Sequence, residues 1–395
     1  MAVTTSDLKF TSSTVSEPAS PLVAGVVSFK GLVHLFGKTG SNGVSEVEIG
    51  LMGVSSINDW FARLTKSAVG KSGPTGAWAG EWWAVHNYLQ YGGICLVGAT
   101  GSTGDYYSAN GVLGVTNTPL HNKTLADIDV IFEAGNTFSS AAAVSVATTR
   151  QDCIAIVGNV QKIAGLPLSS TYNNQLVDFS VSDTSEYVVY VAGRKKFVAG
   201  VGSAVNILEA DLSPDVAGCF ARSYRDASPW YSPAGKTRGR ILGVVAMQQN
   251  FTETDQSYLY AGNVNPVVVF PGEGTFLMGN KTSYSGTGSL SKINTASLIS
   301  YLKKELLTAT QKYLFEVNDA ITRQKVVSTV TPIMTSIQAG NGISNYRIVC
   351  DETNNTSEIL AQNKLVLDVY IQPTPTAETL VITIINTNTS EAFSG

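Results

Sequence analysis

Residues 228–247 read SPWYSPAGKTRGRILGVVAM, and residues 263–282 read NVNPVVVFPGEGTFLMGNKT. Both stretches combine apolar, often β-branched residues with Gly and Pro at short intervals. This pattern is typical of buried strands joined by tight turns. Neither stretch contains a complete nucleophile, metal-binding or phosphate-binding motif. They therefore predict a structural scaffold rather than a catalytic site.

The sequence after residue 282 changes to helices and then to strands. A first helix is predicted by apolar residues spaced three or four apart. The residues on that face are Leu298, Leu302, Leu306 and Tyr313. A second helix is expected to begin at Asn318 or Asp319, which can cap its N-terminus, and to end or kink at Pro332. Alternating apolar residues predict a strand over 365–371, and a final strand is expected over 379–387.

Strands and helices alternate upstream of residue 230. An aromatic amphipathic helix is predicted over 78–91, followed by two glycines and the apolar strand ICLVG. Strands are predicted over 128–135 and 152–159 with a helix between them. A strand pair over 186–202 and a helix over Ser213–Tyr224 follow. Because these strands are apolar throughout, we expect an α/β layer whose sheet is covered on both faces.

The composition is that of a packed protein with few charges. The chain has 395 residues, 44% hydrophobic and only 14% charged, with a net charge of −4. This length allows two or three domains. The sparse charge suggests a surface largely covered by partner subunits, although a monomer with a Ser/Thr/Asn-rich surface is an alternative. The acidic balance argues against nucleic-acid binding, because neutralising phosphates requires clustered Lys and Arg.

Membrane, disulfide and zinc features are not expected. No apolar run approaches the ~18 residues of a membrane-spanning helix, and the N-terminus has no signal pattern. We therefore expect a soluble protein without membrane insertion, made in the cytoplasm. The cysteines are far apart, without CxxC spacing, and are expected to be single buried thiols. They are Cys95, Cys153, Cys219 and Cys350.

Two GKT fragments resemble part of a phosphate-binding loop, which requires an earlier glycine at fixed spacing. Before Gly37-Lys38-Thr39, the nearest earlier glycine is Gly31, one residue too far away. Before Gly235-Lys236-Thr237, the required position is Trp230. Neither fragment predicts a nucleotide site.

The glycine-rich loop ICLVGATGSTG over 94–104 is the best candidate for a cofactor site. Its glycines follow an apolar strand, as in dinucleotide-binding turns. However, the residues that follow include Gly, Asn and Pro where a helix should begin. We favour a loop after a core strand and keep an NAD(P)-dependent oxidoreductase as the alternative. With three histidines and neither a nucleophile elbow nor a metal cluster, we expect no enzyme, cofactor or metal.

Five segments taken in order resemble the C-terminal domain of contractile phage tail sheath proteins. They are SPWYSPAGKTRGRI, NVNPVVVFPGEGTFLMGNKT, SLISYLKKELLTATQKYLFEVNDAITRQKVVSTV, GISNYRIVCDETNN and LVLDVYIQPTPTAETLVITI. The upstream α/β region is similar, more loosely, to the Rossmann-like core of that family. Before about residue 75 little can be matched.

The resemblance implies four parts of the chain. The fold class expected is α/β, with a Rossmann-like core and an α+β C-terminal sheath domain. The parts are an N-terminal linker arm (1–20), the core domain (21–229, with 21–75 poorly matched), the C-terminal sheath domain (230–387) and a C-terminal linker arm (388–395). Because the chain is short for this family, we expect a compact subunit with little surface decoration.

The resemblance also implies a structural function. Such subunits form stacked sixfold rings around an inner tail tube and contract to drive the tube through the host envelope. The implied partners are further copies of the chain, the tube protein, and the baseplate and tail-terminator proteins. The implied location is the virion tail, assembled in the host bacterial cytoplasm. A phage-derived bacteriocin or other contractile injection system fits equally, and a capsid or adhesin subunit is a weaker alternative.

Two sets of residues are implied as contact sites. In the family, terminal arms add strands to neighbouring subunits, and here the arms and last strand offer Leu8, Phe10, Leu380, Ile382, Ile384 and Phe393. The alternative is that both tails are disordered. The family also meets its tube through a C-terminal helix, for which Arg323, Lys325, Lys303 and Lys304 are the expected tube-facing residues. A solvated or intrasubunit face is the alternative for each of them.

Overall fold

The computed structural model describes residues 30–35, 50–54, 79–99, 128–132, 140–160, 185–199 and 206–378. The two predicted arms and the predicted final strand over 379–387 lie outside these residues. The arm residues Leu8, Phe10, Leu380, Ile382, Ile384 and Phe393 therefore lie outside them as well.

In the described part of the chain, eight strands form one mixed sheet in the order β11-β10-β6-β5-β4-β1-β3-β2. They are β1 (Lys30–Leu35), β2 (Gly50–Val54), β3 (Ile94–Ala99), β4 (Val130–Phe132), β5 (Ile154–Val160), β6 (Val188–Ala192), β10 (Val264–Phe270) and β11 (Gly274–Leu277). The inner strands run parallel, and β2 and β11 pair antiparallel at the two edges. Every residue of β4 and β6 is buried, which agrees with a sheet covered on both faces.

The order of the parallel strands does not confirm the Rossmann-like description. Numbered along the chain, the parallel strands β1, β3, β4, β5, β6 and β10 lie in the order 2-1-3-4-5-6. The Rossmann order is 3-2-1-4-5-6, whereas the order found here follows the other common doubly wound arrangement. The coarser prediction of mixed helices and parallel sheet is confirmed.

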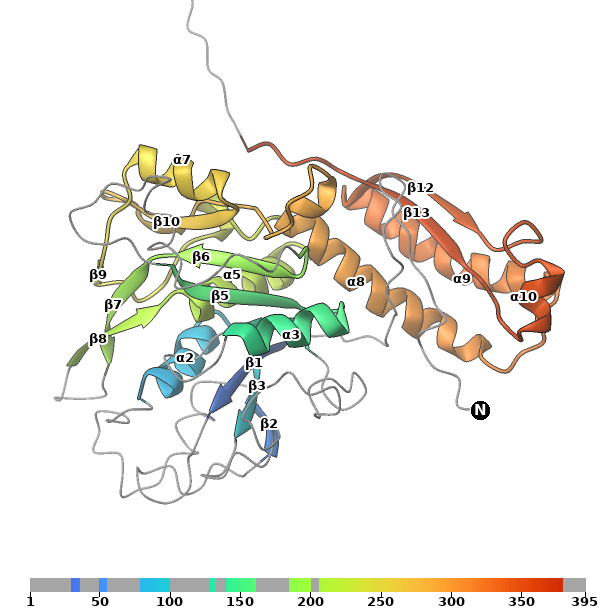
Figure 1. Cartoon of the computed structure of the whole chain (residues 1–395), viewed down its shortest axis with the longest axis horizontal. Coiled ribbons are helices and arrows are strands. Elements are labelled where there is room, and N and C mark those ends of the chain that lie inside the picture. The colour runs from blue at the N-terminus through green and yellow to red at the C-terminus, as the bar shows by residue number, and fades with distance from the viewer. Residues whose placement is uncertain are drawn as a thin grey trace, which may run out of the picture.

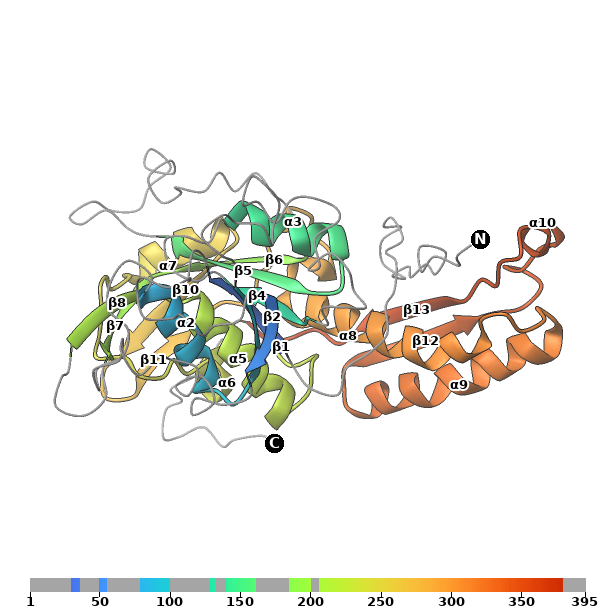
Figure 2. The ribbon, with the colours of Figure 1, turned by 90° about the horizontal axis from the view of Figure 1, so that it is seen from below.

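Helices cover both faces of this sheet. Figure 2 shows α3 (Ser140–Arg150) on one side and α2 (Ala79–Leu89) with α5 (Ser213–Asp226) on the other. In α2, the aromatic residues Trp83 and Tyr88 are buried, and the Tyr88 ring stacks on Phe132 of β4 at 4.9 Å. The helices predicted over 78–91 and from Ser213 are thus present, and their apolar side chains form the core.

A smaller sheet lies beside the large one, in the order β8-β7-β9. Its strands are β7 (Arg194–Ala199), β8 (Asn206–Asp211) and β9 (Ala246–Met247). The strand pair predicted over 186–202 is therefore divided between two sheets, with β6 in one and β7 in the other. Gly193 stands at the break with φ +115°, a conformation that L side chains rarely adopt, which lets the chain change sheets there.

The C-terminal unit, residues 284–378, is an α+β structure beside the large sheet (Figure 1). Its helices are η5 (Ser289–Ser291), α8 (Ile293–Thr310), η6 (Gln311–Tyr313), α9 (Ala320–Ala339) and α10 (Ser357–Ala361), and its strands are β12 (Ile343–Val349) and β13 (Asp368–Pro373). The predicted apolar face of the first helix is confirmed for Leu298, Leu302 and Leu306, which are buried in a second hydrophobic core with α9 and the two strands. Tyr313, the fourth residue predicted on this face, lies beyond the end of α8 in η6 and is half-buried.

Helix α9 begins where predicted but passes through Pro332. The Asp319 carboxylate accepts a hydrogen bond from the Thr322 backbone N–H at 2.7 Å, which confirms it as the N-cap. Of the two predicted effects of Pro332, an end or a kink, the end does not occur, because α9 continues to Ala339. Pro332 lies on the exposed face, while Val330 and Met334 beside it are buried in the second core. Packing of the apolar face holds the helix together across the missing backbone donor.

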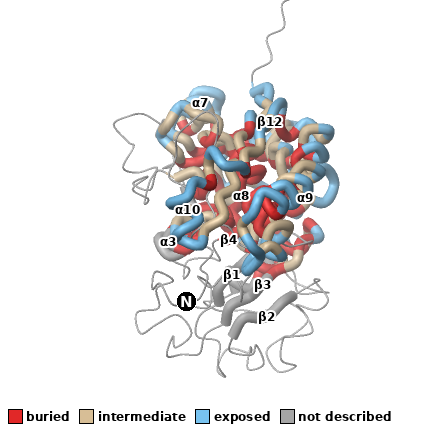
Figure 3. Tube along the Cα trace, turned by 90° about the vertical axis from the view of Figure 1, so that its right-hand side faces the viewer, coloured by how far each residue is buried: buried red, intermediate tan, exposed pale blue. Residues whose placement is uncertain are grey.

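The predicted domain boundary at residue 230 is not where the fold divides. Strand β10 pairs in parallel with β6, and β11 pairs with β10, so residues 264–277 belong to the large sheet. Two short helices, α6 (Gly235–Arg238) and α7 (Glu253–Ala261), lie in the same region. Figure 3 shows buried residues concentrated inside, with exposed residues along the outer sides of α7, α9 and α10. The α/β unit therefore extends through the motif SPWYSPAGKTRGRI to β11.

Candidate functional site

Lys303 and Lys304 attach α8 to the α/β unit and do not face outward. They are 1% and 4% exposed. Lys303 Nζ donates to the Gln151 carbonyl at 3.0 Å and to the Tyr187 hydroxyl. Lys304 Nζ donates to the Ile128 carbonyl at 2.7 Å and pairs with the Asp129 carboxylate at 2.6 Å. The expectation that these lysines face a tube is wrong, because the α/β unit covers this side of α8.

The two predicted cations of α9 have different environments. Arg323 is 6% exposed, donates to Asn318 Oδ1 at 3.1 Å, and has its Nη2 4.0 Å from the Glu352 carboxylate. Its charge is therefore engaged mainly within the subunit. Lys325 is exposed and lines an open groove. The groove residues are Tyr313, Ile321, Gln324, Lys325, Ser328 and Thr329.

Exposed apolar side chains follow η6 in the chain: Phe315 and Val317 lie in the loop before α9, and Ile321 lies in the first turn of α9 and lines the groove. Phe315 is 89% exposed, Val317 74% and Ile321 64%. Phe315 also has φ +71°, a left-handed conformation that is strained for a bulky residue. Lys325 thus lies next to an apolar projection at one end of the C-terminal unit.

Strands β12 and β13 form a two-stranded antiparallel sheet with α9 packed against it. Val369 and Ile371 face the second core, while Arg347 lies over the Tyr370 ring at 4.6 Å. Within the described residues no third strand pairs with this sheet. A two-stranded sheet exposes unpaired backbone donors and acceptors along its edges, so it could accept a further strand.

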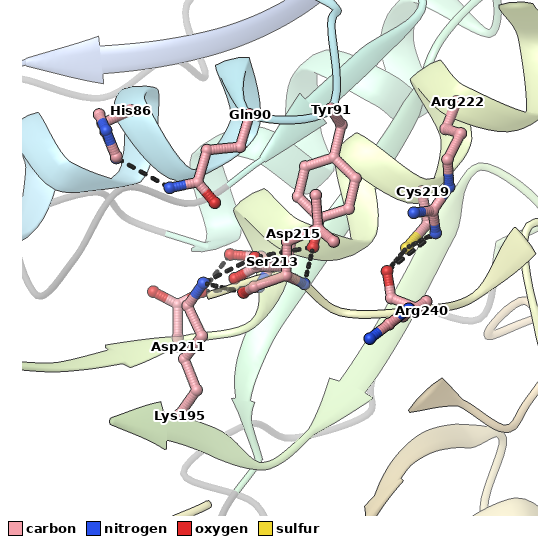
Figure 4. A network of polar contacts seen from close by, with 11 residues as sticks. His86, Gln90, Tyr91, Lys195, Asp211, Ser213, Asp215, Cys219, Arg222 and Arg240 are labelled. Atoms are coloured by element: carbon pink, nitrogen blue, oxygen red, sulfur yellow. Dashed lines mark hydrogen bonds and ion pairs between the residues drawn. The ribbon is translucent and has the colours of Figure 1, made fainter. Parts of the chain in front are cut away.

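A buried polar network lies between α2, β7 and α5 (Figure 4). Lys195 Nζ pairs with the Asp215 carboxylate at 2.7 Å, and both side chains are 0% exposed. The Tyr91 hydroxyl donates to the same carboxylate oxygen at 3.0 Å and accepts from the Leu242 backbone N–H at 2.8 Å. Lys195 also donates to the Leu242 carbonyl at 3.1 Å. These bonds join the large sheet's helices to the small sheet.

The network continues along α5 as structural contacts. Asp211 accepts from the Ser213 backbone N–H at 2.9 Å, and Arg222 donates to the Arg240 carbonyl at 2.8 Å. Burial raises the pKa of Asp215 despite the nearby Lys195. Burial also raises the pKa of the Cys219 thiol to about 12. A thiol with that pKa is not a nucleophile at neutral pH, so the network resembles a catalytic cluster only in its residue types.

The sequence reasoning missed this network, although a signal was present. Residues 194–199 read RKKFVA, and Lys195, Phe197 and Ala199 share one face of β7. Because Phe197 and Ala199 are apolar, period-2 alternation places Lys195 toward the core with them. A lysine on an apolar strand face requires a buried acceptor, which Asp215 provides.

The remaining expectations concern chemistry and membranes. Strand β3 is confirmed, but the rest of the glycine-rich loop, residues 100–104, lies outside the described residues. In the part of the chain that the structure describes, no group of His, Cys, Asp and Glu could hold a metal ion. Among the same residues, no helix is long and apolar enough to cross a membrane. The four cysteines are buried free thiols, as predicted.

Two family models match the chain. The model described as the phage tail sheath protein central domain covers residues 130–283, and that of the phage tail sheath C-terminal domain covers residues 286–387. The boundary between the two matched regions lies just after β11, the last strand of the large sheet, and not at residue 230.

The chain is 31% identical over 264 residues to the tail sheath protein of Vibrio phage KVP40, and 30% identical over 260 residues to that of Enterobacteria phage T4. Each alignment covers 63% of this chain and 39% of the relative, so the chain spans well under half of the relatives' length. The fold is also similar to a chain in the contracted helical sheath of the anti-feeding prophage. The TM-score is 0.68 at 17% identity, covering 94% of this chain and 98% of that one.

Removing the buried Lys195 should be strongly destabilising. Lys195→Met leaves the Asp215 charge without its ion-pair partner, and breaking such a pair costs about 3–5 kcal/mol. Adding Asp215→Asn should restore part of this loss. Lys196→Met is the matched control, because the Lys196–Glu209 pair is 3.3 Å long with side chains 42% and 40% exposed. It should cost under about 1 kcal/mol. Urea unfolding of the four proteins measures these differences, and equal losses from the two single lysine variants would contradict the assignment.

The stability of the fold should fall between pH 6.5 and pH 4 because of His86. Burial, with a smaller effect of Lys195, lowers the pKa of His86 from 6.5 to about 4, although the neighbouring Asn87 acts in the opposite direction. Below pH 6.5, His86 binds a proton in the unfolded chain but remains neutral in the folded chain until about pH 4. Stability is therefore full above pH 6.5 and falls by about 3 kcal/mol by pH 4. His86→Phe should flatten this part of the unfolding free energy against pH; an unchanged slope would show that other groups cause it.

Proposed function

Because the chain belongs to the phage tail sheath family, a family of structural proteins and not of enzymes, we propose that it is the subunit of a contractile tail sheath that forms stacked sixfold rings around an inner tube. Contraction of these rings would drive the tube through the host envelope. The observation that carries the proposal is the match of both sheath domains in order, over residues 130–283 and 286–387. The fold of the contracted anti-feeding prophage sheath supports it over 94% of the chain.

The proposed assembly partners are further copies of the chain, the inner tail tube protein, and the baseplate and tail-terminator proteins. The proposed location is the virion tail, with assembly in the host bacterial cytoplasm. The curated relatives named above are phage proteins, whereas the anti-feeding prophage supplies a similar fold. Neither the comparisons nor the described residues support the oxidoreductase alternative.

Subunits are proposed to remain linked through their termini. The two-stranded sheet of β12 and β13 has the open edges that added strands require. The proposed donors are the arm segments, with Leu8 and Phe10 at one end and Ile382, Ile384 and Phe393 toward the other, together with Leu380. Added strands would satisfy the unpaired backbone donors and acceptors at these edges.

Contact with the tube is proposed through the exposed side of α9. Of the four residues considered, Lys325 is exposed, whereas Arg323 is largely buried and Lys303 and Lys304 serve the attachment of α8. We therefore assign the tube contact to Lys325, with acidic groups on the tube as its counterparts. The adjacent apolar residues Phe315 and Ile321 lie on the same end of the unit.

Deleting both termini should abolish polymerisation. Negative-stain electron microscopy would compare the full chain with a truncation lacking residues 1–18 and 388–395. We expect striated hollow cylinders from the full chain and single subunits from the truncation, since the N-terminal donor with Leu8 and Phe10 and the end of the C-terminal donor with Phe393 are removed. Cylinders from both proteins would reject the arm contacts while keeping the sheath assignment. Small particles from the full chain that also bind a nicotinamide cofactor would favour the oxidoreductase instead.

Reversing the charge of Lys325 should separate the sheath from its tube. With Lys325→Glu, coexpressed sheath and tube should yield sheath polymers but far fewer sheathed tubes, because like charges would face each other. Lys236→Glu is the control, since Lys236 is 51% exposed and pairs with Glu273 on the α/β unit. Electron microscopy counts the sheathed tubes, and normal numbers from the Lys325 variant would reject this contact.

A further inference from the structure

The last described residues, 374–378, form a strap that returns from β13 to the α/β unit. Figure 1 shows the chain leaving β13 and running toward α7. The Thr374 backbone N–H donates to the Gly342 carbonyl at 3.2 Å, which holds the start of the strap beside α9's C-terminal end. The strap therefore links the two units at a second place, apart from α8.

Glu378 ends the strap in a set of converging donors. Its Oε2 accepts from Lys292 Nζ at 2.6 Å and from the Tyr260 hydroxyl at 2.7 Å. Its Oε1 lies 3.5 Å from Asn280 Nδ2, which also donates to Thr376 Oγ1 at 3.3 Å. The side chains of Lys292 and Glu378 are 31% and 25% exposed. Three separate elements thus contribute donors to one carboxylate.

These donors are held in place by other contacts of the α/β unit. Asn280 is 5% exposed, accepts from Ser232 Oγ at 2.9 Å, and donates to Asn294 Oδ1 at 2.9 Å. Lys281 Nζ donates to the Tyr260 carbonyl at 2.7 Å and lies 4.4 Å from the centre of the Tyr260 ring. The Asn280 amide, the Tyr260 side chain and the Lys281 ammonium group are therefore positioned by contacts outside the strap.

The charges in this cluster favour a carboxylate. Lys281 and Lys292 bring two positive charges; Glu378 pairs with Lys292, and its negative charge also acts on Lys281. Two ammonium groups close together repel each other, and an anion between their donors relieves that repulsion. A charged carboxylate also satisfies the Tyr260 hydroxyl and the Asn280 amide together, which a neutral side chain at position 378 would do less well.

We propose that Tyr260, Asn280, Lys281 and Lys292 form a built carboxylate-binding site whose occupant is Glu378 of the same chain. This site fixes where the C-terminal segment leaves the subunit. Its relevance to linking subunits rests on the proposed sheath function, but the anchor itself is a property of the single subunit.

The anchor joins the beginning of the C-terminal unit to its end. Lys292 immediately precedes α8 and Glu378 follows β13, so the ion pair joins the two ends of this unit. Tension on the residues beyond 378 then reaches α7 and the start of α8 through Glu378. Without the anchor, the same tension would act on β13 and peel it from β12. The site therefore protects the two-stranded sheet when the terminal segment is pulled.

The test is the mobility of the strap in the isolated full-length subunit. All four native cysteines are buried, so Ala377→Cys offers an accessible thiol for a nitroxide spin label. In this background Glu378→Ala should raise the mobile fraction of the electron paramagnetic resonance spectrum at least about fivefold. Glu378→Gln, which keeps an acceptor but loses the charge, should give a smaller rise. Lys292→Glu should also mobilise the label, and combining it with Glu378→Lys should restore only part of the immobilisation, because a lysine cannot accept hydrogen bonds from Tyr260 and Asn280.

The matched control is Glu273→Ala in the same labelled background. Glu273 makes an equally short ion pair, 2.6 Å to Lys236, on the same α/β unit but away from the strap. It should leave the spectrum unchanged. An unchanged spectrum in Glu378→Ala, or equal mobilisation by Glu273→Ala, would overturn the anchor. Because this measurement uses unassembled subunits, its failure would leave the sheath proposal standing, and absence of cylinders would leave the anchor standing.

Discussion

The burial of two adjacent lysine ammonium groups against the parallel sheet is the constraint on which the arrangement of the subunit depends. Lys303 and Lys304 carry their charges from α8 to acceptors around β4, β5 and β6, where Asp129 balances one of them. Charges removed from water are tolerated only with close partners. The position of α8 on the α/β unit is therefore fixed within narrow limits. Through α8, the positions of α9 and of the β12–β13 sheet are fixed as well.

A subunit fixed in this way suits a lattice that rearranges without its subunits unfolding. The two hydrophobic cores are separate, yet α8 contributes to both, with Ile293 and Ala296 in the first and Leu298 and Leu302 in the second. Helix α8 therefore packs in both hydrophobic cores and is not merely a linker between the two units. In the proposed sheath, movement would occur between subunits, while each subunit moves as one body.

Local patterns in the sequence predicted the helices and strands. They could not predict the contacts between elements that lie far apart in the chain. The face of Leu298, Leu302 and Leu306 and the cap at Asp319 depend on neighbours within a few turns, and both are confirmed. Lys303 and Lys304 lie beside that face, and only the docking of the α/β unit decides that they are buried. The domain boundary predicted at residue 230 differs from the observed division for the same reason, because the pairing of β10 with β6 joins residues that are far apart in the chain. The candidate arms lie outside the described residues, so the sequence and the family resemblance remain their only support.

The closeness of Lys292 and Glu378 has a consequence for how such a chain can be altered. A segment whose two ends lie side by side can be removed, replaced or lengthened without changing the body from which it emerges. The two ends of the C-terminal unit meet in this way, since 2.6 Å separates Lys292 Nζ from the Glu378 carboxylate, while Lys303 and Lys304 keep α8 bound to the α/β unit. Replacement or lengthening is therefore expected in the part of the C-terminal unit that does not pack on the α/β unit. Variants could diverge there, with the α/β unit kept as a constant frame.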